Sequence, residues 1–252
     1  TKYLNDRRKQ FLATISVLIA GFIFPYGLAP YNLWPATIIS LGFLCHNIFQ
    51  QPNLVVFNRV LSFNCGLFFC GVSWLHISIH EHGFIALPLA ILATLFFCVF
   101  VAGISSIPFL LWRFLPKIWV SHLLAFPSLW VLGEFFRSWF ATGFPWLFAG
   151  YSLQTTWLAG WAPLGGVFWL SFMACFTASF VALVCRKHLT RVPKISCATA
   201  ILSSFITGFL LLKVNWTVPI DPVLSVTLIQ PNISQSQKWS PDRRDMIVRQ
   251  LV

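Results

Sequence analysis

The sequence predicts an α-helical multi-pass membrane bundle of about seven spans, followed by the first strand and helix start of a truncated α/β domain. Hydrophobic residues make up 58% of the 252 residues, and charged residues only 9%. Soluble domains carry about 25% charged residues, so this chain lacks the polar residues of an ordinary water-exposed surface. Apolar runs of about 20 residues, the length that crosses a bilayer as a helix, recur along the chain.

The apolar runs are separated by turns and by basic segments. Residues 1–10 are polar and basic, and no small-residue cleavage site follows the first apolar run, so we expect a retained helix there and not a signal peptide. Prolines and glycines end this run and open the next one. The expected spans are 11–28, 33–49, 54–79, 84–112, 118–136, 162–185 and 195–214.

The basic residues predict the orientation of these spans. If the N-terminus is cytoplasmic, the segments on that side carry Lys2, Arg7, Arg8, Lys9, Arg59, Arg113, Lys117, Arg186, Lys187, Arg191 and Lys194. The opposite side carries only Arg137 in its short loops, and Lys213 near the end of the last span. Positive charge concentrates on the cytoplasmic side of membrane proteins. We therefore expect the loop at 138–161, and everything after 214, on the outer side.

The C-terminal part of the chain has a different character. Residues 1–214 are expected to form the transmembrane bundle and 215–222 a linker. Residues 223–230 are rich in β-branched side chains and read as a strand, and Ser240-Pro241-Asp242 is typical of a helix start. A lone strand cannot bury its faces, so residues 223–252 predict the beginning of an α/β domain.

A few polar residues fall inside or at the ends of the apolar runs. Arg59 is expected either to reach the cytoplasmic surface with its long side chain or to face the bundle interior. Glu134 and Arg137 stand three residues apart, so they are expected to pair on one helical face, with a contact to a lipid headgroup as the functional alternative. The His76, His80 and His82 cluster ends a span at the water boundary, where solvation explains it better than a metal site.

Charge and cysteine content exclude other classes. The net charge of +11 comes from short clusters between apolar runs, which is the pattern of cytoplasmic loops and not of a groove for nucleic acid. The seven cysteines lie mostly within or beside apolar runs and form no C-x-x-C pair, so we interpret them as small buried hydrophobic residues.

The loop at 138–161 is the longest aromatic-rich connection and contains the turn Gly143-Phe144-Pro145-Trp146. Tryptophan and tyrosine collect at membrane–water boundaries, so the loop predicts either a simple interfacial anchor or a lipid-handling site.

Four motifs, in this order, resemble the apolipoprotein N-acyltransferase family. They are the hairpin from Pro25 to Ala36, the helix end from Gly71 to Ile79, the Phe-Pro-Trp turn with its flanking helix ends, and the tail from Val226 to Trp239. Each motif alone is weak, and their order and spacing make the resemblance specific over nearly the whole chain.

The resemblance implies a bacterial inner-membrane enzyme with a periplasmic nitrilase-like domain, acting as a monomer and without a cofactor. Its cysteine would take an acyl group from a membrane phospholipid and pass it to the amino group of a diacylglyceryl apolipoprotein, with Glu as base and Lys stabilising the oxyanion. That Glu-Lys-Cys triad is expected beyond Val252. The chain begins at Thr1 and stops within a helix-like segment, so we expect an inactive N-terminal fragment.

Trp146 and Trp239 match tryptophans that line the family's lipid entrance, so the resemblance assigns substrate binding to Trp146, Trp239, Pro145 and Phe144. The alternative for each is simple packing. Two other functions stay open for the chain. A membrane scaffold or pseudoenzyme would lack the triad altogether, and a transporter would need a polar path through residues such as Asn58, Arg59 and Asn64.

Overall fold

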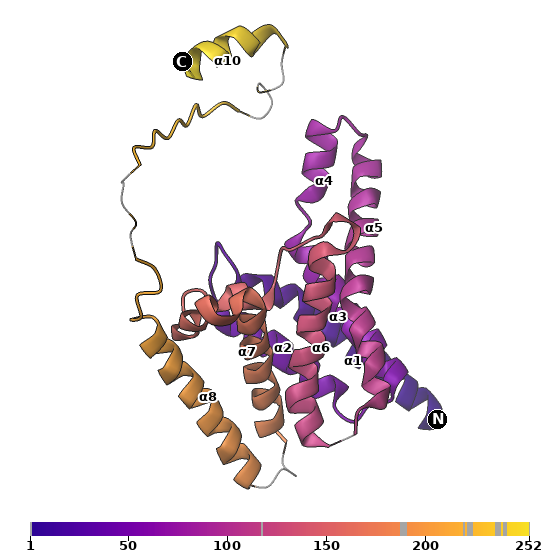
Figure 1. Ribbon diagram of the computed structural model, residues 1–252. Coiled ribbons are helices and arrows are strands. Elements are labelled where there is room, and N and C mark those ends of the chain that lie inside the picture. The colour runs from indigo at the N-terminus through magenta and orange to yellow at the C-terminus, as the bar shows by residue number, and fades with distance from the viewer. Residues whose placement is uncertain are drawn as a thin grey trace.

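The computed structural model describes residues 2–116, 118–186, 191–218, 220, 224–234, 238 and 241–251. Within these residues the chain forms a bundle of long helices joined by short helical turns (Figure 1). The helices of at least 15 residues are α1 (Lys2–Ile23), α2 (Trp34–Ile48), α3 (Asn53–Gly71), α5 (Leu87–Ser106), α6 (Trp119–Trp139), α7 (Ala162–Val184) and α8 (Arg191–Leu211).

Among the residues that the structure describes, five stretches are long and apolar enough to cross a membrane. They are Arg7–Gly27, Asn53–Gly71, Leu87–Phe114, Trp157–Val184 and Lys194–Leu211. The helices α2 and α6 are not among them, and α2 has only 15 residues. Large apolar side chains such as Phe96 on α5 and Leu202 on α8 are exposed on the outside of the bundle. An apolar exterior of this extent is typical of a multi-pass membrane protein.

Close helix contacts hold the bundle together. The helix α1 packs along α3, and α7 packs against both α2 and α6. At the crossing of α1 and α3 a Cβ atom on Gly66 would lie 2.1 Å from the backbone oxygen of Leu18, so only glycine permits this approach. Behind the crossing, Trp130 contacts Phe24 and Phe63 with ring centroids 6.0 and 5.8 Å apart, and these rings form the centre of the core.

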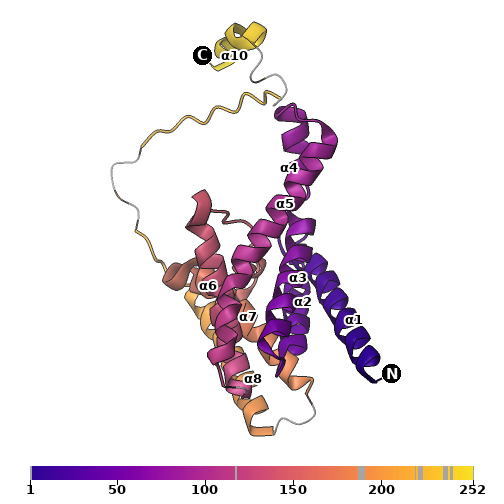
Figure 2. The same cartoon turned by 90° about the vertical axis from the view of Figure 1, so that its right-hand side faces the viewer.

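The third expected span, 54–79, is wrong at its C-terminal end. The helix α3 stops at Gly71, and the chain turns before α4 (Leu75–Ile77) and a π-helical turn, Ser78–His82. The apolar character continues through the break, so hydropathy carries no signal for it. Together, α4 and the start of α5 project beyond the ends of the other long helices of the bundle in both views, at the end opposite the N-terminus (Figures 1 and 2).

The tail after α8 has only part of the secondary structure that the sequence predicts. The expected helix start is confirmed by a 3-10 turn, Pro241–Arg243, that leads into α10 (Arg244–Leu251). Residues 224–230, the described part of the expected strand, have no regular secondary structure (Figure 1). A strand needs a neighbour for its backbone hydrogen bonds, and no strand is present among the described residues.

Two polar residues inside the bundle tie helices together. Arg59 is buried; it donates hydrogen bonds to the carbonyl oxygen of Asn47 at the end of α2 and, over 2.6 Å, to Gln10 Oε1 on α1. Asn64 donates to Ser106 Oγ on α5 over 2.9 Å. Both side chains therefore serve helix packing, and Arg59 takes the interior position that the sequence left as one of two alternatives.

Candidate functional site

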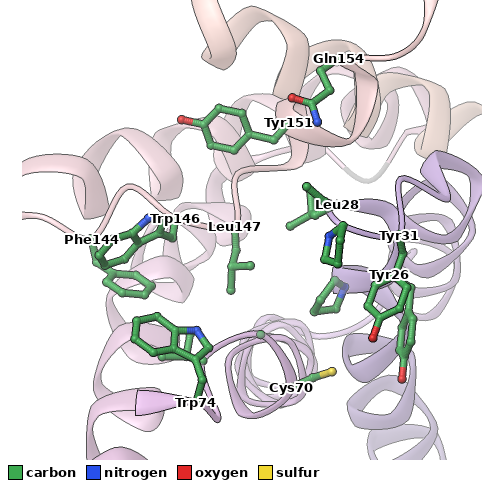
Figure 3. A pocket seen from close by; sticks show the side chains of 15 residues that line it. Tyr26, Leu28, Tyr31, Cys70, Trp74, Phe144, Trp146, Leu147, Tyr151 and Gln154 are labelled. Carbon is green, nitrogen blue, oxygen red and sulfur yellow. The ribbon is translucent and has the colours of Figure 1, made fainter. Parts of the chain in front are cut away.

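A pocket of about 600 Å³ opens at the end of the bundle opposite the N-terminus. Three segments far apart in the sequence form its walls: the hairpin 25–31 after α1, the end of α3 with Trp74, and the loop 144–154 before α7 (Figure 3). In the expected orientation all three connect helices on the outer side. The pocket therefore forms only when the fold brings the three segments together, since each of them supplies only one wall.

The first wall is a hairpin of prolines and tyrosines. Tyr26 and Tyr31 lie on one side of the pocket with ring centroids 5.1 Å apart (Figure 3). The amide of Gln154 donates a hydrogen bond to Asn32 Oδ1 over 3.3 Å, which joins this hairpin to the loop before α7.

The facing wall is aromatic. The ring of Trp146 meets Phe144 edge-on at 4.9 Å between centroids and Trp74 at 6.2 Å. Phe144 in turn contacts Phe97 on α5 at 5.1 Å. Edge-to-face aromatic pairs of this kind stabilise a wall by about 0.5–1.5 kcal/mol each beyond their burial. Trp146 remains 57% exposed and forms the rim of the pocket.

Leu147 points into the pocket from a strained backbone (Figure 3). Its φ of +61° lies in the left-handed region, which costs a residue with a Cβ atom roughly 1–2 kcal/mol. Such a conformation persists only where the surroundings hold it. Two charged residues near the end of α6, Glu134 and Arg137, supply that support from either side of Leu147.

Arg137 holds the loop on the N-terminal side of Leu147. Its guanidinium donates hydrogen bonds to the carbonyl oxygens of Phe144, over 3.2 Å, and Trp146. It also lies 5.0 and 4.8 Å from the ring centroids of Phe68 and Phe148. The side chain is only 4% exposed, so these contacts replace its water shell.

Glu134 holds the loop on the C-terminal side. Its Oε1 accepts hydrogen bonds from the backbone N–H of Ala149 over 2.7 Å and from Trp130 Nε1 over 2.8 Å. Next along the chain, the N–H of Gly150 donates to Ser171 Oγ on α7 over 2.8 Å. The expected pairing of Glu134 with Arg137 is not a direct one: the two opposite charges attract each other, but in this described part of the chain each side chain hydrogen-bonds to the loop and no ion pair joins them.

The predicted site residues are partly brought together. Trp146 and Phe144 line the pocket, whereas Pro145 lies between them and does not. Trp239 lies outside the described residues. Sequence reasoning did not assign Trp74 and Leu147 to the site, although Trp74 belongs to a motif quoted for the resemblance. The predicted topology could have pointed to these residues, since it places the ends of spans one, three and five on the same side of the membrane.

The histidine cluster takes no part in the pocket. His80 Nδ1 is paired with the carbonyl oxygen of Ile85 at 2.7 Å, and His76 Nδ1 with that of Ser73. Among the described residues no group of three or more potential metal ligands occurs. The one cysteine at the pocket, Cys70, lies in the last turn of α3 with apolar neighbours (Figure 3).

The geometry suits an amphiphilic ligand. The pocket interior is lined by aliphatic and aromatic side chains, and the tyrosine and tryptophan side chains on its walls offer hydrogen-bond donors beside apolar rings. Large aromatic surfaces pack against flexible hydrocarbon without demanding one ligand conformation. The end of the bundle that carries the pocket is also where a membrane helix meets the headgroups.

Comparisons with known proteins agree with the motifs. Residues 20–180 match the family model described as the apolipoprotein N-acyltransferase N-terminal domain. The chain is 39% identical over 241 residues to the apolipoprotein N-acyltransferase of Azotobacter vinelandii, covering 94% of this chain and 46% of that protein. For the enzyme of Coxiella burnetii the identity is 38%, covering 91% and 48%, and for that of Pseudomonas syringae it is 36%, covering 94% and 47%.

The chain spans about half the length of the curated relatives it matches. The matched family model covers α2, α3, α5, α6 and most of α7, together with all three walls of the pocket. The chain belongs to the apolipoprotein N-acyltransferase family.

Proposed function

We propose that the protein containing this chain transfers an acyl group from a membrane phospholipid to the N-terminal diacylglyceryl-cysteine of apolipoproteins. Membership of the family is the observation that carries this proposal. The chain itself supplies the membrane part, and its pocket of about 600 Å³ provides a place where a lipid can leave the bilayer. That volume lies within the range of about 300–1,000 Å³ typical of ligand sites.

The pocket residues take defined roles in this proposal. Trp146 and Phe144 guide an acyl chain along the aromatic wall, and Leu147 forms the floor beside the end of α3. Pro145 sets the turn that separates the two rings. Trp239 belongs to the same entrance by resemblance.

The chemistry implied by the family is covalent catalysis. A cysteine thiolate attacks the phospholipid ester, releasing a lysophospholipid and leaving a thioester, and the lipoprotein amine then attacks that thioester and restores the thiol. The Glu, Lys and Cys that carry out these steps belong to a nitrilase-like domain that begins in residues 223–252. Residues 1–252 alone are therefore inactive.

The proposed arrangement has seven spans in the inner membrane, a cytoplasmic N-terminus and a periplasmic pocket. The basic residues support it, since Arg113 and Arg186 lie at the end of the bundle away from the pocket. At the pocket end the described helix connections before α8 carry no lysine or arginine, Arg137 lies in the last turn of α6, and Lys213 follows α8. Arg137 is buried and its guanidinium donates hydrogen bonds to loop carbonyl oxygens, so it does not serve as a surface charge.

The test uses a bacterial strain whose own lipoprotein N-acyltransferase is under depletion. The gene is expressed through its complete reading frame, past the codon for Val252, and the N-terminal peptide of an abundant lipoprotein is analysed by mass spectrometry. We expect the triacylated form with the complete frame and only the diacylated form with residues 1–252. Diacylated peptide in both cases, with both proteins present in the membrane, would refute the enzyme and favour a scaffold.

A further inference from the structure

A second, much smaller cavity lies inside the bundle, below the anchored loop. It is lined by side chains of α3, α5 and α6 and leaves about 10 Å³ for the centre of a water molecule. That is close to the smallest space that holds one water, roughly 10–15 Å³. This cavity is separate from the larger pocket at the end of the bundle, since no residue lines both.

Three of the residues that line this cavity each carry a buried polar atom without a hydrogen-bond partner. These atoms are Glu134 Oε2, Arg137 Nε and Ser105 Oγ. The Glu134 and Arg137 side chains are 3% and 4% exposed. A buried polar atom without a partner costs free energy, so three such atoms on the residues around one small space favour a polar ligand in it.

The charges at the cavity identify the class of that ligand. Arg137 Nε–H is a donor and a carboxylate Oε2 is an acceptor, whereas the hydroxyl of Ser105 serves as either. An anion would be repelled by Glu134 and a cation by Arg137, and an apolar group would leave all three atoms unpaired. A single water molecule accepts from Arg137, donates to Glu134 and pairs with Ser105, so it satisfies the whole set.

We propose that this cavity holds one ordered water molecule that bridges Glu134, Arg137 and Ser105. The water connects α5 to the two residues that anchor the pocket loop. The helices approach closely at this point, because a Cβ atom on Gly133 would lie 2.5 Å from the backbone oxygen of Ser105. The water thus helps to position the Arg137 and Glu134 side chains. Arg137 bonds to the loop at Phe144 and Trp146, and Glu134 bonds to it at Ala149.

This inference stands apart from the proposed reaction, since it concerns only the architecture below the loop. The direct test is a structure of the complete protein in lipid nanodiscs, at a resolution that shows ordered water. We expect one density peak within hydrogen-bond distance, about 2.6–3.2 Å, of the three atoms. An empty cavity, or a collapsed one in which Glu134 and Arg137 bond directly to each other, would overturn the proposal.

Two variants at one position provide a second test. Ser105→Ala removes the hydroxyl and leaves the water two partners, whereas Ser105→Val places methyl groups in the cavity and expels it. Hydrogen exchange of loop amides 143–151 is expected to rise about tenfold or more in Ser105→Val and clearly less in Ser105→Ala. The control is Ser128→Val on the exposed side of α6, where the hydroxyl bonds only to Leu124 O of its own helix. Equal exchange in the two Ser105 variants would contradict a bridging water.

Discussion

Replacing Arg137 by methionine should release the pocket loop while leaving the bundle formed. Methionine keeps a long apolar stem between the rings of Phe68 and Phe148, so packing changes little. The substitution removes both hydrogen bonds to the loop carbonyls of Phe144 and Trp146. It also leaves Glu134 as the remaining buried charge at this end of α6.

The size of the effect follows from the bonds that are lost. A hydrogen bond to a charged group contributes about 1.5–3 kcal/mol, so the two bonds together are worth at least about 3 kcal/mol. A difference of about 1.4 kcal/mol is a factor of ten, and the opening equilibrium of the loop should therefore shift about 100-fold.

Hydrogen–deuterium exchange measured by mass spectrometry follows this opening directly. The reporter peptides cover residues 143–151, which include the bonded amides of Ala149 and Gly150. Amides in α3 serve as an internal reference, since local opening of the loop does not expose them. We expect about 100-fold faster exchange in the loop peptides of Arg137→Met and little change in α3.

Two further variants separate the contributions. Arg113→Met is the control, because Arg113 is exposed and its guanidinium lies only against the Phe114 ring at 4.5 Å. Arg137→Lys keeps the charge beside Glu134 but loses the forked donor geometry, so its effect should fall between wild type and Arg137→Met. A change below threefold in Arg137→Met loop peptides, or equal acceleration throughout the protein, would refute the anchoring role.

Three other predictions concern the pocket, the helix packing and the orientation. Trp146→Ala should lower kcat/KM for phospholipid about tenfold in the complete enzyme, because two edge-to-face contacts of about 0.5–1.5 kcal/mol each are lost from the pocket wall. The control is Trp139→Ala, which should have little effect, since Trp139 is also 57% exposed but lies outside the pocket. Gly66→Ala should lower the free energy of unfolding by about 1–3 kcal/mol, measured by chemical denaturation in detergent, since the added methyl group meets the α1 backbone. A membrane-impermeant maleimide added to spheroplasts should label Cys70 at the pocket and reach the exposed Cys185 only after permeabilisation.

Each of these predictions has a defined contrary outcome. Equal loss of activity in Trp146→Ala and Trp139→Ala would point to general interfacial anchoring. The packing control is Gly103→Ala, where a Cβ atom meets nothing within 4 Å, and a similar loss there would remove the steric explanation. Labelling of Cys185 in intact spheroplasts would reverse the proposed orientation.

The helical spans were largely predictable because each is a long apolar run ended by proline, glycine or charge. The start of α7 at Ala162 and the end of α2 at Ile48 lie within a residue of the expected bounds. The early end of α3 at Gly71 was not predictable, since apolar residues continue past it. Hydropathy reports which residues avoid water, and it does not distinguish a straight helix from an apolar turn.

The site was predictable only in part, for a related reason. Trp146 and Phe144 stand out as aromatic residues in a loop, and both line the pocket; their part in substrate binding stays a prediction. Apart from the Trp130 indole, the hydrogen-bond partners of Glu134 and Arg137 are backbone groups 7 to 15 residues downstream. Every residue carries such groups, so spacing alone favoured a direct ion pair that the structure does not form. The water cavity depends on three helices meeting and has no pattern in the sequence.

The proposed function requires that the pocket at the end of the bundle opposite the N-terminus receives a phospholipid acyl chain. Photo-crosslinking tests it most directly: the complete protein is placed in nanodiscs that contain a phospholipid with a diazirine on its acyl chain, and the adducts are mapped by mass spectrometry. We predict adducts at Leu147 and Trp146 that excess unlabelled phospholipid suppresses and that Trp146→Ala, but not Trp139→Ala, reduces. Adducts confined to the apolar exteriors of α5 and α8, with none at the pocket, would show that the pocket does not bind the acyl chain.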